Sequence, residues 1–190
     1  DLDETGLAGL VAGIEAAGGR ALAVRCDVSK DDDLEALAVR TAEAFGPADI
    51  LVNNAGVMLR GPIEAMPLSE WEWIMGINFF GAVRGVNTFA PAMLARGSGH
   101  VVNVASVGGL MGGRPHSAAY SASKFALVGY SETLYVAMKS KGIGVSVLCP
   151  GGVRTALPDA IRLSAAAREG EDYGLGEAFG PEAAEPEAIA

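Results

Sequence analysis

Two side chains in the segment YSASK have the types and spacing that proton transfer requires. Tyr120 and Lys124 stand four residues apart, so in a helix both project from the same face. A free phenol has a pKa of about 10, but a neighbouring ammonium stabilises the phenolate and lowers that pKa. A tyrosine tuned in this way is a competent general acid and base. In an arbitrary helix, however, such a pair is far more often a surface tyrosine beside a solvated lysine.

Two further polar residues precede this pair. Ser106 ends the apolar run HVVNVAS at 100–106, where a hydroxyl can hydrogen-bond a substrate oxygen and stabilise charge that develops on it. A serine that simply ends a strand or caps a loop would look the same. Asn78 lies in an otherwise apolar helical segment, where an amide is usually either a solvent-facing residue or a break in the helix.

Small and polar residues also follow other apolar runs. The sequence N-N-A-G at 53–56 ends the run DILVNN, and small residues there let the backbone approach a flat ligand closely. A strand-ending turn without a ligand has the same composition. Asp27, ahead of Val28, suits a hydrogen bond to a base or a sugar, and equally suits the cap of the next helix.

These residues are spaced along an alternation of helical and strand-like segments. Ser29 with Asp32, and Ser69 with Glu72, are interpreted as capping pairs at helix N-termini. The patterns predict helices at 2–18, at 31–45, from Ser69 to about Arg96 (continuous or interrupted) and at 118–141. They predict strands at 21–26, 49–54, 100–106 and 143–150.

Nearly continuous apolar strands separated by helices predict a parallel sheet covered on both faces. The expected fold class is therefore α/β, a doubly wound, Rossmann-like sheet. Ligands of such sheets bind at the C-terminal ends of the strands. Asp27, Asn53 to Gly56, Ser106 and Gly151-Gly152 all stand at such ends.

Size and composition set further limits. With 190 residues, 50% of them hydrophobic, the chain is long enough for one core and favours a single domain over 1–190. The net charge of −9 disfavours nucleic acid and anionic membranes as partners. No apolar run approaches the roughly 18 residues of a membrane span, and no leader-like segment begins the chain. Cys26 and Cys149 are expected to be reduced, and no metal-type cluster is visible. We expect a cytoplasmic, metal-free protein.

The order and spacing of the motifs resemble the short-chain dehydrogenase/reductase family, in the branch with Y-x-x-x-K and N-N-A-G motifs. The resemblance covers residue 1 to about residue 155. It rests on Asp27-Val28, N-N-A-G at 53–56, Asn78, Ser106, YSASK at 120–124 and PGGVRT at 150–155.

This resemblance implies an NAD(P)-dependent oxidoreductase that interconverts a secondary alcohol and a ketone by hydride transfer. Tyr120 would be the acid/base. Lys124 would lower its pKa and hold the nicotinamide ribose, Ser106 would orient the substrate, and Asn78 would hold a water in a proton relay. The implied cofactor contacts are Asp27 and Val28 at the adenine, Asn53, Ala55 and Gly56 along the cofactor, Tyr120 and Lys124 themselves, and Pro150, Gly151, Val153 and Thr155 around the nicotinamide carboxamide.

One family motif has no match in this chain. The T-G-x-x-x-G-x-G turn, which seats the pyrophosphate on a helix N-terminus, is missing, and so are the strands around it. We therefore expect the chain to be a portion of a longer protein, which an intact-protein mass would test. Asp1 stands about where NAD-preferring members carry an acidic residue, which favours NAD over NADP.

Other properties stay open at this level. The segment 156–190 is interpreted as a substrate flap followed by the start of a last helix at Pro186-Glu187. Leu110, Met111, Leu157, Ile161 and Leu163 favour an apolar alcohol or ketone, although packing under a flap would give the same composition. The resemblance implies a homodimer or homotetramer, with Phe125, Val128, Leu134 and Met138 facing either a partner or the chain's own core.

Two alternative functions fit the same fold. A cofactor-binding regulator or scaffold would keep the architecture and lose turnover. Such a protein would be expected to lack part of the catalytic set, but all four residues are present here: Asn78, Ser106, Tyr120 and Lys124. An epimerase or lyase would use the same tyrosine, although the N-N-A-G and P-G-G-V-x-T patterns favour simple redox chemistry.

Overall fold

The computed structural model describes residues 1–112, 114–153, 161–174 and 183–185. The elements are α1 (Glu4–Ala16), α2 (Asp31–Phe45), β1 (Ile50–Asn53), β2 (Met58–Arg60), α3 (Leu68–Asn78), α4 (Phe80–Arg96), β3 (Gly99–Val104), the short 3-10 helix η1 (Val107–Gly109), α5 (Ala118–Lys139), β4 (Ile143–Leu148) and β5 (Ile161–Leu163).

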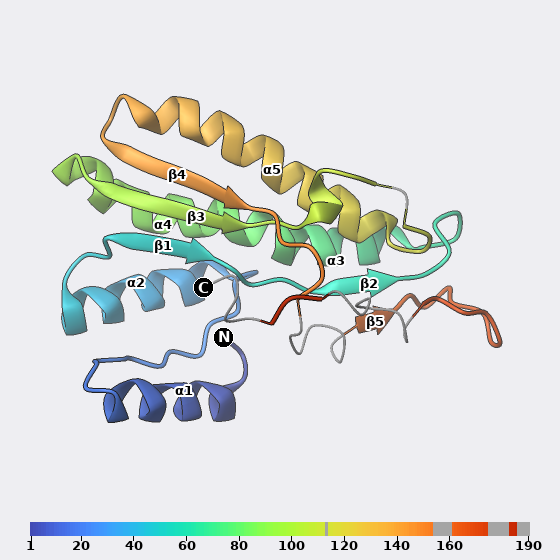
Figure 1. The fold of residues 1–190 in the computed structure, drawn as a ribbon, viewed down its shortest axis with the longest axis horizontal. Helices are drawn as coiled ribbons and strands as arrows, with labels where there is room; N and C mark the ends of the chain where they lie inside the picture. The colour runs from blue at the N-terminus through green and yellow to red at the C-terminus, as the bar shows by residue number, and fades with distance from the viewer. Residues whose placement is uncertain (113, 154–160, 175–182, 186–190) are drawn as a thin grey trace.

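A three-stranded parallel sheet in the order β1-β3-β4 forms the centre of the molecule, as Figure 1 shows. Its strands connect through α3 and α4 and through α5, which is the alternation that the sequence predicts. All three strands run in the same direction, so their C-terminal ends share one edge of the sheet. The Rossmann-like α/β fold class is thereby confirmed.

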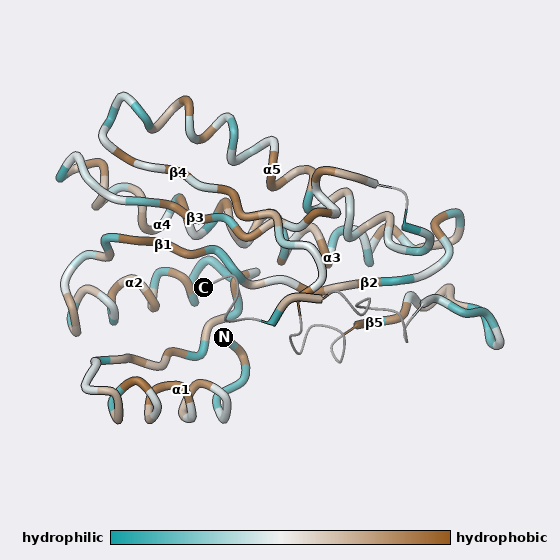
Figure 2. Tube along the Cα trace, viewed as in Figure 1, coloured by the Kyte–Doolittle hydropathy of each residue, from teal (hydrophilic) through white to brown (hydrophobic). Residues whose placement is uncertain are grey.

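Helices α4 and α5 pack on one face of this sheet. The main core lies between them and the strands, and buries Val86, Met93, Val101, Leu134 and Ile143. Figure 2 shows the hydrophobic chain along β1 and β4 that supplies part of this layer. Burial of this apolar surface is the main stabilising contribution to such a layer.

The opposite face of the sheet is open among the described residues. Ile50 and Val52 of β1 are 62% and 56% exposed, while their neighbour Leu51 packs into the core. Alternate residues of a strand point to opposite faces, so the pattern means that one face alone is covered. The prediction of cover on both faces therefore does not hold for the described part of the chain.

The strand predicted at 21–26 is wrong. This segment is extended but forms no ladder, and its one backbone bond to a distant residue runs from the Cys26 N–H to the Asp1 carbonyl. A strand needs a neighbour to satisfy its backbone groups, and none of the described residues lies beside this segment as a strand. Figure 1 shows α1 and 21–26 apart from the three-stranded sheet, and α1 has no buried residue.

The predicted helix positions agree with the structure better than the predicted N-terminal caps do. Helix α2 spans the predicted residues, but its N-cap is Lys30, because the Ser29 hydroxyl donates to the Asp27 carboxylate instead (2.7 Å). Helix α3 begins at Leu68 after Pro67, so Ser69 lies inside the helix and caps nothing. The predicted interruption before Arg96 is present at Phe79, between α3 and α4.

Helix α5 buries most of its apolar face within the chain. Val128 and Leu134 belong to the chain's own core, and Met138 packs against it. Phe125, Tyr135 and Val136 remain exposed on the same helix. Of the four residues predicted to face either a partner or the core, Val128 and Leu134 therefore face the core.

The segment 161–174 contacts β2 and α3. Strand β5 pairs in parallel with β2, and the segment 161–174 is held to α3 by Glu70, whose carboxylate accepts bonds from the Ser164 hydroxyl (2.6 Å) and the Ala165 N–H (2.8 Å). Thr155, Leu157 and the helix start predicted at Pro186-Glu187 lie outside the described residues, as does part of the predicted flap.

Candidate active site

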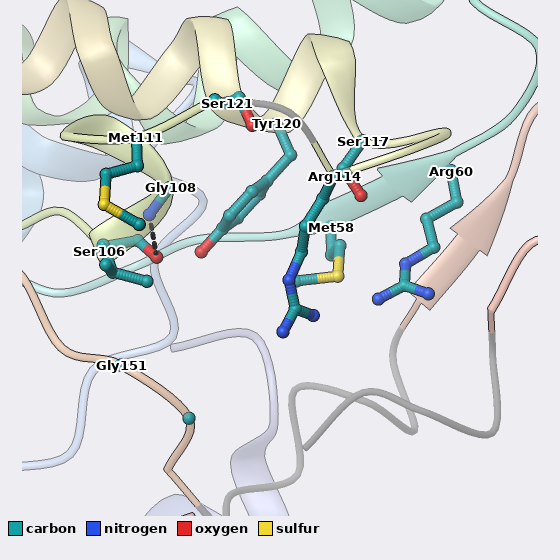
Figure 3. Close-up of a pocket in the computed structure, with 13 residues that line it drawn as sticks. Met58, Arg60, Ser106, Gly108, Met111, Arg114, Ser117, Tyr120, Ser121 and Gly151 are labelled. Carbon is teal, nitrogen blue, oxygen red and sulfur yellow. Dashed lines mark hydrogen bonds between the residues drawn. The ribbon is translucent and has the colours of Figure 1, made fainter. Parts of the chain in front are cut away.

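Ser106 and Tyr120 meet at the C-terminal edge of the sheet. Ser106 follows β3 and begins η1, where its Oγ accepts a hydrogen bond from the Gly108 N–H (3.1 Å). Tyr120 lies in the first turn of α5 and lines a pocket together with Ser106. Figure 3 shows the Tyr120 hydroxyl on the side of its ring that faces Ser106. The two side chains therefore line the same pocket.

Lys124 lies behind Tyr120, one helical turn further along α5. Its side chain is only 4% exposed, and Nζ donates to the Val104 carbonyl at 2.9 Å. Nζ lies 5.8 Å from the centre of the Tyr120 ring. Burial lowers the pKa of Lys124 from 10.5 to about 8, while the nearby Cys149 raises it. At neutral pH the ammonium therefore keeps its proton, but loses it far more easily than an exposed lysine.

The pKa of Tyr120 differs from the sequence expectation. Burial raises it above its ordinary value, and hydrogen bonding with Ser106 opposes this rise. We expected Lys124 to lower it. The ammonium instead directs a hydrogen bond to the Val104 carbonyl, and desolvation destabilises the phenolate as well as the ammonium.

Asn78 is the last residue of α3 and is 1% exposed. Its Oδ1 accepts from the Val57 N–H (2.8 Å), and its Nδ2 donates to the Val57 carbonyl and to the Ser123 hydroxyl (3.0 Å each). Ser123 in turn donates to the Tyr120 carbonyl at 2.7 Å. The amide therefore ties the chain after β1 to the first turns of α5.

Ser123 was missed by sequence reasoning. It is fully buried and is the direct link between Asn78 and the helix that carries Tyr120. The signal was its place inside YSASK, one residue before Lys124, on the helix side that must be buried if Lys124 is buried.

The N-N-A-G turn runs beside this group. A Cβ added at Gly56 would lie 3.4 Å from Lys124 Nζ and 3.5 Å from Asn78 Oδ1, so the glycine backbone is in contact distance of both. Ala55 is exposed beside it. The Asn53 side chain instead points into the sheet, where its Nδ2 donates to Asn103 Oδ1 at 2.8 Å. Asn53 is thus engaged by the sheet interior, and its side chain is not directed at a ligand.

The predicted adenine contacts lie just before α2, near the C-terminal end of β1, where Asn53 approaches the Ala82 carbonyl of α4. The Asp1 carbonyl accepts from the Cys26 N–H (3.0 Å), which brings Asp1 beside Asp27. The Asp27 carboxylate accepts from the N–H and the hydroxyl of Ser29, and these bonds lower its pKa. Val28 packs against Gly81 of α4, where a Cβ would approach it to 2.9 Å.

The segment after β4 forms the opposite side of the pocket. The Pro150 carbonyl accepts from the Val107 N–H (2.8 Å), and Gly151 and Gly152 line the cavity. Val153 forms an isolated parallel bridge with Ala184. Thr155 lies outside the described residues, so its predicted cofactor contact stays a prediction.

The pocket has a mixed lining. Its walls are formed by Met58, Arg60, Ser106, Val107, Gly108, Met111, Gly112, Arg114, Ser117, Tyr120, Ser121, Gly151 and Gly152. Of the apolar residues predicted to face the substrate, Met111 is among them, while Leu110, Ile161 and Leu163 are not. Sequence reasoning missed Arg60 and Arg114, because nothing in their local sequence shows that β2 and the turn before α5 reach the same cavity (Figure 3).

Two negative observations concern the described residues only. No group of three or more His, Cys, Asp or Glu side chains in this part of the chain could hold a metal ion, and Cys26 and Cys149 are free thiols. Within the same residues, no helix has the length and apolar character needed to cross a membrane.

Comparison with known proteins agrees with this architecture. The family described as short chain dehydrogenase matches residues 1–165. Ketoacyl reductase HetN from Nostoc sp. is 36% identical over 150 residues, which is 79% of this chain and 52% of that protein. The first curated relatives are therefore matched over 52–61% of their own length.

Solved structures give the same result. A short chain dehydrogenase/reductase from Burkholderia phymatum in complex with NAD superposes with a TM-score of 0.82 at 39% identity, covering 94% of this chain and 66% of that one. A gluconate 5-dehydrogenase from Burkholderia cenocepacia, in complex with NADP and tartrate, gives 0.77 at 31% identity, covering 84% and 62%. With its family match, its parallel sheet and its grouped Ser106, Tyr120 and Lys124, the chain belongs to the short-chain dehydrogenase/reductase family.

Proposed function

We propose that the protein interconverts a secondary alcohol and a ketone with a nicotinamide cofactor, and that Tyr120 is its general acid and base. One observation carries this proposal. The hydroxyls of Tyr120 and Ser106 line one pocket, while Lys124 and Asn78 lie buried behind them and are tied to the same helix. This combination supports a site in which a proton donor and an oxygen-binding hydroxyl face the substrate oxygen and a buried cation lies behind them.

The residues present fit the nicotinamide-ribose end of a dinucleotide. Glycine backbone at 108, 151 and 152 lines the pocket beside Tyr120, which leaves room for a flat ring. Lys124 Nζ has three donors, of which the Val104 carbonyl takes one, so others are available for ribose hydroxyls. Gly56 brings backbone within reach of the same place. A bound nicotinamide would supply or accept the hydride.

The proton would be transferred by Tyr120, with Ser106 and Lys124 stabilising the charges that form. In the ketone-reducing direction, Ser106 and Tyr120 donate hydrogen bonds to the carbonyl oxygen, and the Tyr120 O–H transfers its proton as negative charge develops there. The charged Lys124 stabilises the phenolate that remains. In the alcohol-oxidising direction the phenolate accepts that proton. The raised pKa of Tyr120 favours its role as a donor at neutral pH.

Asn78 acts in this proposal as a positioning residue. Its amide oxygen and nitrogen are bonded to Val57 and Ser123, so it fixes the turn at Gly56 relative to Tyr120 and Lys124. The water-holding role implied by the family resemblance stays a prediction.

The finer cofactor and substrate assignments are also proposals. Asp1 is exposed beside Asp27, and its acidic side chain would repel a 2′-phosphate, which supports NAD over NADP. Related structures contain either NAD or NADP. Because the relatives range from a ketoacyl reductase to a gluconate 5-dehydrogenase, family membership does not select the substrate. Exposed Phe125, Tyr135 and Val136 on α5 support assembly as a homodimer or homotetramer.

The decisive test is Tyr120→Phe in the full-length protein. Loss of general acid/base catalysis should lower kcat by about 100-fold or more, because the phenyl ring keeps the packing and loses the transferable proton. NADH binding, followed by fluorescence, should stay within about threefold, since the remaining cofactor contacts are unchanged. Retained turnover of secondary alcohols would exclude this mechanism. Cofactor binding without turnover in the unmodified protein would favour a regulatory or scaffold role.

A further inference from the structure

The pocket continues into a second cavity on the side away from Ser106. Arg60, Pro115, His116, Asp172, Tyr173 and Gly174 line it together with Arg114 and Ser117. Arg60, Arg114 and Ser117 belong to both linings, so these residues mark the place where the two cavities meet. Figure 3 shows Arg114 extending alongside Tyr120, with its guanidinium directed into the same open space.

The charge of Arg114 has no partner among the described residues. Its guanidinium takes part in none of the ion pairs or hydrogen bonds found in that part of the chain. Arg60 differs, because its guanidinium donates to the carbonyls of Tyr173 (2.9 Å) and Gly174. Arg114 is exposed, and it lies where the two cavities meet in a chain with a net charge of −9.

A carboxylate in the lining of the second cavity already accepts a hydrogen bond. Asp172 is the one acidic residue among the described lining of the two cavities, and its Oδ1 accepts from the Gly174 N–H at 2.7 Å. It forms no ion pair with Arg114. Arg114 therefore remains available to an anion from outside the chain.

The turn that carries Arg114 is held from two sides. His116 has a φ of 63°, which is unusual for a residue with a side chain. Its carbonyl accepts from the Gly61 N–H (3.0 Å), and its ring packs on the Tyr173 ring at 4.9 Å between centres. Contacts from Gly61, directly after β2, and from the 161–174 segment thus maintain a strained backbone next to the pocket, a common property of ligand-binding turns.

We propose that the substrate carries an anionic group, a carboxylate, which binds Arg114 while the reacting carbon lies at Tyr120 and Ser106. Met58 and Met111 line the pocket with these residues and suit the short apolar chain that would join the two groups. A guanidinium matches a carboxylate in a two-point hydrogen-bonded geometry. This inference rests on the proposed redox function and adds its substrate class: a keto acid and the corresponding hydroxy acid.

The test compares acids with their esters in the full-length protein. The substrates are 4-oxopentanoate and 5-oxohexanoate, each beside its methyl ester, with the reduced cofactor at saturation. Arg114→Gln removes the charge, Arg114→Lys keeps it, and Arg40→Gln on the exposed surface of α2 is the matched control for net charge. Calorimetry of 4-oxopentanoate binding to the protein with oxidised cofactor measures affinity without turnover.

The unmodified protein should prefer at least one acid over its ester by about tenfold or more in kcat/KM, which is the range expected for one charge-assisted hydrogen-bonded contact. Arg114→Gln should abolish this preference by raising KM for the acid, and it should weaken 4-oxopentanoate binding in calorimetry by a similar factor. Arg114→Lys should keep part of the preference for the acid. Arg40→Gln should leave it unchanged, and added salt should reduce it in the unmodified protein.

Equal acid-to-ester ratios in the unmodified protein and in Arg114→Gln would overturn the inference and leave the proposed function intact. Absence of turnover on acids and esters alike would count against the proposed function. In that case, calorimetric binding that is insensitive to Arg114→Gln would overturn the inference as well, and sensitive binding would support it.

Discussion

Two buried asparagines bond serines of α5 that lie about two helical turns apart, and the surroundings of the two asparagine–serine pairs differ. Asn78 donates to Ser123 at 3.0 Å, and Asn103 donates to Ser131 at 2.9 Å. Each serine donates in turn to a carbonyl of α5, at 2.7 and 2.6 Å. All four side chains are buried. The hydrogen-bonding unit is therefore the same in both places.

The surroundings decide what each pair does. Asn103 faces its strand neighbour Asn53 across the β1–β3 ladder, and the whole group is uncharged. Asn78 holds the turn after β1 next to the buried ammonium of Lys124. The first arrangement satisfies polar groups within the sheet, whereas the second holds a charge where it is costly. We therefore propose that the Asn103 pair contributes to stability and that the Asn78 pair contributes to the site.

Lys124→Met should give the largest effect and separate stability from activity. The pKa shift from 10.5 to about 8 corresponds to about 3 kcal/mol of destabilisation of the charged form. The unfolding free energy of the variant at pH 7, measured by urea titration, should therefore rise by up to about 3 kcal/mol. Its kcat should fall by about 100-fold or more. Lys139→Met, at the exposed end of the same helix, should change neither. A less stable Lys124→Met would show that the bond to Val104 outweighs desolvation.

Alanine at the two asparagines should break the comparison directly. Asn78→Ala and Asn103→Ala each leave buried donors or acceptors without partners, so each should lower the unfolding free energy by about 2–4 kcal/mol. Only Asn78→Ala should also reduce kcat per folded molecule, by about tenfold or more, because Lys124 and Gly56 lose their fixed spacing. Urea unfolding and kcat measured on the same samples provide the check. An equal loss of kcat in Asn103→Ala would remove the proposed division of roles.

Replacing the two serines with alanine should give smaller losses of stability than replacing the two asparagines. Asn78 Nδ2 keeps the Val57 carbonyl when Ser123 is removed, whereas Asn103 Nδ2 has Ser131 as its acceptor. Ser131→Ala should therefore cost about 1–3 kcal/mol and Ser123→Ala about 1 kcal/mol or less. Thermal unfolding of both variants in one buffer tests the order, and the reverse order would contradict the hydrogen-bond assignment.

The smallest effect should be a pH dependence of the Lys124 contribution. Its pKa is lower in the folded state, at about 8, than the ordinary value of 10.5. Below pH 8 Lys124 is protonated in both the folded and the unfolded protein, so its burial destabilises the folded state by the full amount. Between pH 8 and 10.5 the lysine keeps its proton only in the unfolded protein, and this destabilisation decreases as the pH rises. The stability advantage of Lys124→Met should thus shrink by about 1 kcal/mol between pH 7 and pH 9. An advantage that grows with pH would have the wrong sign.

Sequence patterns predicted the elements well because apolar periodicity reports burial. They placed β1, β3, β4 and α5 within a few residues, and they brought Ser106, Tyr120 and Asn78 to one edge of the sheet. They failed where the outcome depends on a partner. Segment 21–26 has strand composition, yet an extended segment becomes a strand only when a neighbour accepts and donates its backbone bonds.

The details of the site were harder to predict for the same reason. Asn53 was expected to belong to the segment that lines the cofactor, but its side-chain amide bonds its cross-strand partner Asn103 inside the sheet. A Cβ at Gly85 would come within 2.4 Å of Asn53 Oδ1, so a glycine 32 positions away decides where that amide fits. Arg114 enters the pocket through a turn whose strained His116 no periodicity reveals.

The hydrogen bonds from Ser164 and Ala165 to the Glu70 carboxylate provide a way to measure how often the 161–174 segment separates from α3. The Ala165 amide proton is bonded to a buried carboxylate, so it can exchange with deuterated water only when the segment leaves α3. Deuterium uptake at this amide therefore counts how often the wall formed by Asp172 and Tyr173 detaches from the body. Glu70→Gln would speed that uptake from a position outside both cavities, which separates the rate of opening from the chemistry inside.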